Sequence, residues 1–258
     1  MKGTLMGILT PNYLAYEYRK CGNPFDDWNY DLNRSFLGST NGSITQRIDN
    51  RLVEDILPRA DLTLALHSGG NNIYVCPRVI VPIKDEKHLE LAKAMGSHWS
   101  LIARPAGERA NITTNYAGPC IELGIPELTV ELGGANKRLP EEDEKDVNTF
   151  QNSVLSVMKH YGMLDENAEY ADEITIVDYE PLRNTHGGLI QYAPECQLNS
   201  KVKKDTLLMI IVDIFGNKAE EARAPYDMII LSVPAQPYLP NGGAQIMTIG
   251  EITELIKR

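Results

Sequence analysis

Two patterns of apolar positions divide the chain. From Gly3 to about Tyr161, short apolar runs alternate with segments in which apolar residues recur at helical spacing, which is typical of a sheet with helices on its faces. After about Ala171 the pattern changes to strand-length segments separated by turns rich in proline and glycine. We therefore predict an α/β region over residues 1–168 and a small, hammerhead-like all-β domain over residues 169–258.

Three helices are predicted in the first region. The segment 43–60 carries an isoleucine or leucine at every fourth position, opens with Ser43 as a capping residue and stops at Pro58. The segments 85–96 and 147–162 have similar periodicity, and the acidic run PEEDEKD before the second of them suits the positive end of a helix dipole.

Three further apolar runs are predicted to be strands. The opening MKGTLMGILTPNY suits a buried strand better than a signal peptide. The runs ADLTLALHSGG and GIPELTVELGG each end in one polar residue, His67 and Glu131, followed by two glycines. Ligands of open α/β sheets bind outside the carboxyl ends of the strands, so both residues are candidates for a site. Either could instead be structural, His67 as a hydrogen-bonded histidine and Glu131 as a helix cap or ion-pair partner.

The loop sequence DWNYDLNRSFLG contains a second candidate. Asn33 and Arg34 offer a side-chain amide beside a guanidinium, and a guanidinium can grip a carboxylate through two parallel hydrogen bonds. The alternative is a turn in which Asp31 and Arg34 form a loop salt bridge and Asn33 stabilises the backbone. The functional interpretation predicts an anionic ligand at this loop.

Composition excludes several classes of protein. The formal charge of -10 would repel a nucleic-acid backbone, so nucleic acid is not an expected partner. The longest aliphatic run, residues 207–212, is too short to cross a membrane. The four cysteines contain no C-x-x-C pair, which favours a reducing cytoplasm over a disulfide framework. The APYDMII segment offers no lysine for a swinging-arm carrier.

Taken together, DLNRSFLG, ADLTLALHSGG, GIPELTVELGG and the tail that follows residue 201 resemble the succinylglutamate desuccinylase and aspartoacylase family of zinc amidohydrolases. The resemblance implies a zinc-carboxypeptidase-like mixed sheet flanked by helices. It also implies hydrolysis of the amide bond of an N-acyl amino acid or a similar small amide. The acyl group and the amino acid are not identified by it, and a homo-oligomer is compatible with it.

The resemblance also implies roles for individual residues. His67 matches the family's last zinc ligand, and Glu131 matches the general acid/base that moves protons during hydrolysis. Asn33 and Arg34 match the pair that binds the substrate carboxylate. Arg19 is the nearest counterpart of an arginine that polarises the carbonyl group.

One departure from the family pattern changes the expectation. The family's other two zinc ligands come from an H-G-x-E motif, and no H-x-x-E occurs in these 258 residues. We therefore expect an N-terminally incomplete α/β region with exposed sheet edges, weak zinc binding and poor hydrolysis. The alternatives are a non-catalytic protein that binds small carboxylates, and a zinc carboxypeptidase that acts on peptides.

Overall fold

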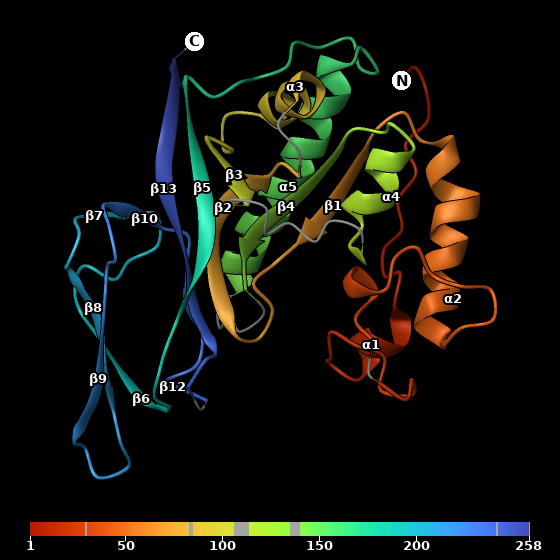
Figure 1. Ribbon diagram of the computed structural model, residues 1–258. Coiled ribbons are helices and arrows are strands. Elements are labelled where there is room, and N and C mark those ends of the chain that lie inside the picture. The colour runs from red at the N-terminus through yellow and green to blue at the C-terminus, as the bar shows by residue number, and fades with distance from the viewer. Residues whose placement is uncertain (29, 83–84, 106–113, 135–139, 241, 258) are drawn as a thin grey trace.

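A nine-stranded mixed sheet runs through the protein (Figure 1). The computed structural model describes residues 1–28, 30–82, 85–105, 114–134, 140–240 and 242–257. The strands of this sheet are β1 (Thr63–His67), β2 (Ile73–Ile80), β3 (Leu101–Pro105), β4 (Glu127–Gly133), β5 (Glu173–Arg183), β7 (Lys201–Val202), β10 (Met228–Ile230), β11 (Ser232–Pro234) and β13 (Gln245–Lys257). Their order is β1-β4-β2-β3-β5-β13-β10-β7, and β11 pairs with β2.

A second sheet lies beyond β13. It contains β6 (Gly188–Tyr192), β8 (Leu207–Val212), β9 (Lys218–Arg223) and β12 (Tyr238–Leu239), in the order β12-β6-β8-β9. The main sheet is mixed, because β1 runs parallel to β4 while β2 runs antiparallel to β4. The predicted fold class, a mixed sheet with flanking helices and a strand-rich C-terminal region, is confirmed.

The three predicted helices are present. The helices are α1 (Tyr13–Glu17), α2 (Ile44–Arg51), α3 (Glu86–Ala94), α4 (Ala117–Glu122) and α5 (Pro140–His160), with helical turns of other types at Leu32–Arg34, Leu52–Ile56 and Leu57–Arg59. Ser43 caps α2 in a full capping box with Gln46. The last helix begins at Pro140, earlier than predicted, because its acidic run forms the first turn instead of preceding it.

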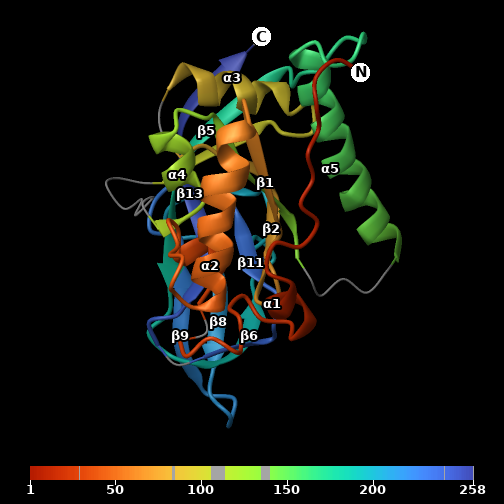
Figure 2. The same ribbon diagram turned by 90° about the vertical axis from the view of Figure 1, so that its right-hand side faces the viewer.

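The helices cover the two faces of the main sheet differently. Leu128 and Val130 of β4 pack with Trp99 in the buried core under α3 and α5. Side chains alternate along a strand, so Glu127 and Glu131 lie on the opposite face. This is the side of α4, because Thr63, the register partner of Glu127, contacts Cys120 of that helix. Figure 2 shows α2 and α4 apart from α5. The polar face of β4 is therefore the face towards α2 and α4.

The main sheet joins the two predicted regions. β5 pairs with β3 in parallel, from Leu101↔Thr175 to Pro105↔Tyr179, and β13 then pairs along almost all of β5. The C-terminal strands therefore extend the sheet of the first region, and only the four-stranded sheet stands apart from it. The boundary between residues 168 and 169 stays a prediction.

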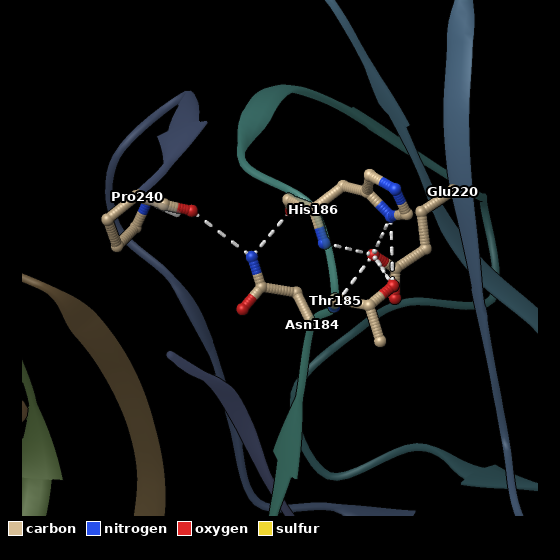
Figure 3. A network of polar contacts seen from close by, with 5 residues as sticks. All are labelled: Asn184, Thr185, His186, Glu220 and Pro240. Atoms are coloured by element: carbon tan, nitrogen blue, oxygen red, sulfur yellow. Dashed lines mark hydrogen bonds and ion pairs between the residues drawn. The ribbon is translucent and has the colours of Figure 1, made fainter. Parts of the chain in front are cut away.

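A carboxylate ties the end of β5 to the second sheet (Figure 3). The Oε2 atom of Glu220, in β9, accepts hydrogen bonds from the backbone nitrogens of Thr185 at 2.8 Å and His186 at 2.7 Å. Burial alone would raise the pKa of Glu220, but these bonds outweigh it and lower that pKa. The Nδ2 atom of Asn184 donates to the carbonyl oxygens of His186 at 2.6 Å and Pro240 at 3.2 Å. These hydrogen bonds satisfy backbone groups of the turn after β5, so the role of the cluster is structural.

The N-terminal strand prediction is wrong. Residues 1–11 form no strand, and the side chain of Leu9 is 99% exposed. In both views the segment passes the β1 end of the sheet (Figures 1 and 2). Apolar composition shows what a segment can bury, but a strand also needs hydrogen-bonding partners. Within the described residues β1 pairs with β4 alone, and the backbone of this segment is anchored through Lys2, whose nitrogen donates to the oxygen of Met163 at 2.8 Å.

Candidate functional site

Three charged or titratable side chains form a row across neighbouring strands. His67, the last residue of β1, is the register partner of Glu131 on β4, and Glu131 is in turn the partner of Arg78 on β2. Register partners point to the same face of a sheet, so the three side chains lie side by side. The sequence analysis expected His67 and Glu131 at one sheet edge, and the parallel pairing of β1 with β4 places them together.

Arg78 forms an ion pair with Glu131. The Nε atom of Arg78 donates to the Oε2 atom of Glu131 at 2.7 Å, and Nη2 donates to the same oxygen. The guanidinium lies 5.9 Å from the centroid of the Tyr179 ring, within the range of a cation–π contact. Arg78 is 4% exposed, and its Nη1 atom is buried without a hydrogen-bond partner among the described residues.

The loop that carries Asn33 and Arg34 is held by hydrogen bonds at both ends. Asp31 caps the helical turn Leu32–Arg34 by accepting from the backbone nitrogen of Asn33 at 2.9 Å. The Oδ1 atom of Asn33 accepts from the backbone nitrogen of Tyr116 at 2.9 Å. The amide nitrogen of Asn33 therefore remains as the donor of that side chain. Arg34 is exposed, and its Nη1 atom donates to the carbonyl oxygen of Asn33 at 2.6 Å.

The charges of this loop act on the row of side chains. Burial lowers the pKa of His67, the negative charges of Glu131 and Asp31 oppose that change, and the positive charge of Arg34 adds to it. Arg34 and Glu131 both also act on the pKa of Tyr179, which burial raises. Asp31 and Arg34 of the loop thus act electrostatically on His67. A lowered pKa keeps His67 neutral, which is the form that ligates metals.

A buried polar cluster lies behind the loop. Glu127 is completely buried, accepts a hydrogen bond from Thr129 at 2.9 Å, and has a pKa raised by burial to about 7. The Oγ1 atom of Thr63 and the Sγ atom of Cys120 lie 3.7 Å apart, and burial raises the pKa of Cys120 to about 12. Tyr116, whose backbone nitrogen holds Asn33, adjoins this cluster.

Arg19 is not brought to the row. It follows α1, is exposed, and has a left-handed backbone with φ of 53°. Its backbone nitrogen donates to the oxygen of Tyr16 at 3.0 Å. The structure gives its guanidinium no contact with His67 or Glu131, so a role in polarising a carbonyl stays a prediction without geometric support.

The sequence analysis missed Arg78 and Glu127. A signal for Arg78 is present, since it is the one charged residue of the strand sequence IYVCPRVI. Glu127 lies on the same face of β4 as Glu131, four residues earlier, as period-2 alternation requires. Both residues could have been predicted by asking which side chains share one face of each strand, instead of considering only the residue at the strand's end.

The described residues do not complete a zinc site. Groups of three or more histidine, cysteine, aspartate or glutamate side chains placed to hold a metal ion are absent from the part of the chain that the structure describes. His67 is the single zinc ligand that the resemblance predicts, and zinc sites in proteins use at least three protein donors. The residues present therefore do not fit a tightly bound zinc ion.

The fold and the site together define an α/β protein in which a histidine and a glutamate lie side by side near the carboxyl ends of two parallel strands. Residues 3–161, more than half of the chain, match the succinylglutamate desuccinylase/aspartoacylase catalytic domain. The chain belongs to this family.

Named relatives agree with this assignment. The N-alpha-acetyl-L-2,4-diaminobutyric acid deacetylase of Halomonas elongata is 27% identical over 247 residues, covering 90% of this chain and 68% of the relative. The product-bound structure of the ectoine utilization protein EutE (DoeB) of Ruegeria pomeroyi has a TM-score of 0.77 at 22% identity. A succinylglutamate desuccinylase of a Silicibacter species has a TM-score of 0.79 at 22% identity. Each of these two structural matches covers 94% of this chain and 73% of the other, and shows the shared fold.

No membrane-spanning helix is evident in the described part of the chain, since none of its helices combines the length and the apolar character that a bilayer requires.

Proposed function

We propose that this chain is an amidohydrolase that removes the acyl group from a small N-acyl amino acid. The observation that carries the proposal is the pairing of His67 with Glu131, with the charge of Arg34 acting on His67. Family membership supports hydrolysis, and the Halomonas relative is named as a deacetylase. The identity of the acyl group is outside the proposal.

The residues divide the work of the reaction as follows. Arg34 and the amide nitrogen of Asn33 bind the substrate carboxylate, which orients the amide bond towards the row. The Glu131 carboxylate accepts a proton from the attacking water as the C–O bond forms. It then returns that proton to the amide nitrogen as the C–N bond breaks, so that the products are a carboxylic acid and an amine.

Zinc enters the proposal through His67. A single imidazole holds zinc weakly, because protein sites need further donors. We therefore propose that this chain binds zinc with low affinity and hydrolyses its substrate slowly. Zinc titration of the purified chain checks this, with stoichiometric and tightly held zinc as the contrary result.

The test of the activity is amine release from a panel of N-acetyl and N-succinyl amino acids, with and without added zinc. Slow turnover is expected for the wild-type chain. Glu131→Gln should abolish turnover and leave substrate binding largely intact, because the amide keeps the shape but cannot accept the proton. Turnover that survives Glu131→Gln would overturn the assignment.

The second candidate is a non-catalytic protein that binds small carboxylates. It is favoured by the absence of a three-ligand metal cluster from the described residues. It predicts binding that depends on Arg34, together with no turnover of any member of the panel. The same assay therefore separates the two candidates.

A further inference from the structure

Arg78 is a buried cation that the proposed reaction does not use. It stands in an apolar strand, and a buried charge persists only where a partner compensates it. Its partner is Glu131, and the ring of Tyr179 lies across the guanidinium at 5.9 Å. The side chain is therefore held from two sides, by a carboxylate on β4 and by an aromatic ring on β5.

The pairing is one-sided. Nε and Nη2 of Arg78 both donate to Oε2 of Glu131, instead of sharing the two carboxylate oxygens. The other oxygen, Oε1, accepts no hydrogen bond from the described residues. Two donors on one oxygen fix the rotation of the carboxylate about its last bond. They leave the second oxygen free to take a proton.

We propose that Arg78 is a positioning residue that locks one oxygen of Glu131 so that the other oxygen faces the reacting atoms. This inference rests on the proposed function of Glu131 as the proton carrier. A general base accelerates a reaction only while it stays within hydrogen-bonding reach of the proton, so a freely rotating carboxylate would be less effective. The guanidinium suits this role because its planar donors are preorganised.

The sheet contains a matched control. Arg104 of β3 forms a similar cross-strand pair with Asp178 of β5, with Nη2 and Oδ1 3.0 Å apart. Arg104 is adjacent in sequence to Ala103, which belongs to the core on the Glu131 face, so its side chain points to the other face. Loss of the Arg104 pair removes a comparable ion pair from the same sheet without touching the row.

The experiment compares Arg78→Met, Arg78→Lys and Arg104→Met in steady-state kinetics on the best substrate of the panel. For Arg78→Met we expect kcat to fall at least about tenfold with KM changed less than about threefold. Arg78→Lys should lose less, and Arg104→Met should keep kcat.

The outcomes separate this inference from the proposed function. A wild-type chain without turnover overturns both. A working wild-type chain in which Arg78→Met keeps kcat within about twofold overturns the positioning role alone. Thermal unfolding of each variant identifies misfolding. If Arg78→Met does not fold, Arg78→Lys carries the same comparison, with unchanged kcat as the contrary result.

Discussion

Two buried carboxyl groups near the site hold their protons unusually tightly. Burial raises the pKa of Glu127 from 4.5 to about 7. Burial also raises the pKa of Asp49 from 3.8 to about 7, with a hydrogen bond from Ser35 opposing it and the charge of Asp31 adding to it. The folded protein therefore binds these protons more strongly than the unfolded chain. The stability that these two groups contribute is fully present below their unfolded pKa values. This contribution is lost as the pH rises towards about 7.

Glu127→Gln should remove part of this pH dependence. The unfolding free energy of the wild-type chain should fall between pH 4.5 and about 7 by on the order of 3 kcal/mol through Glu127, because a shift of one pKa unit is worth about 1.4 kcal/mol. The amide has no proton to lose. The unfolding free energy of the variant should therefore increase relative to that of the wild-type chain as the pH rises. Urea unfolding at pH 5 and pH 8 measures the difference. Glu122→Gln, an exposed change on α4, is the control, and a pH-independent difference for Glu127→Gln would refute the assignment.

Arg34→Ala should weaken carboxylate recognition. A hydrogen bond between charged groups contributes about 1.5–3 kcal/mol, so KM for an N-acyl amino acid should rise about tenfold or more while kcat changes little. Arg34 is exposed, so the unfolding free energy should stay the same. Arg47→Ala removes an equally exposed charge from α2 and serves as the control. Unchanged kinetics in Arg34→Ala would show that the loop does not bind the carboxylate.

At the scale of elements, the sequence predicted the helices and strands that are marked by a local sequence pattern. α2 follows from its capping box and period, and the end of β1 at His67 follows from the glycine pair after it. β4 instead continues past Glu131 to Gly133. β2 was missed because Pro77 interrupts its apolar run, and proline usually argues against a central strand. The structure accommodates Pro77 at a shift of register between Val75 and Arg78 in the pairing with β4. Such a bulge depends on the partner strand, which no local pattern records.

The same distinction applies to the candidate site. Asn33, Arg34, His67 and Glu131 were singled out because each stands in a local motif. The structure pairs His67 with Glu131, and a site shared with Asn33 and Arg34 stays a prediction. The ion pair of Arg78 with Glu131 joins residues 53 positions apart, so it depends on strand order. The N-terminal segment failed for the opposite reason, since its apolar pattern was clear but it pairs with no strand among the described residues.

Ser43→Ala tests the best-defined helix start. The Ser43 hydroxyl accepts from the backbone nitrogen of Gln46 at 3.2 Å, and the Gln46 side chain accepts from the backbone nitrogen of Ser43 at 3.0 Å. Loss of the cap should lower the unfolding free energy by about 1 kcal/mol. Chemical denaturation measures it against Ser97→Ala, an exposed serine outside any helix. Equal stability of the two variants would contradict the capping role.

At the scale of the whole molecule, apolar side chains are exposed near β1, which is an edge strand among the described residues. Five large apolar side chains of the N-terminal segment are exposed, namely Met1, Leu5, Met6, Ile8 and Leu9. Edge strands and exposed apolar residues both favour association between chains, which the formal charge of -10 only partly opposes.

Leu9→Lys should therefore reduce self-association. Leu9 is 99% exposed, so the change should leave the unfolding free energy unaltered. Light scattering over a concentration series should show a smaller mean mass for the variant. Ile214→Lys, at an 86% exposed position in the turn between β8 and β9, adds the same charge elsewhere and should have no such effect. Equal reduction by both variants would attribute association to net charge alone.

The shared sheet also determines how the molecule comes apart. β5 is hydrogen-bonded to β3 on one side and to β13 on the other. Unfolding of either half of the chain would therefore remove a hydrogen-bonded strand from the other half. Calorimetry should accordingly record one heat-absorption peak. Within it, the central amides of β5 should be the last to exchange with deuterium.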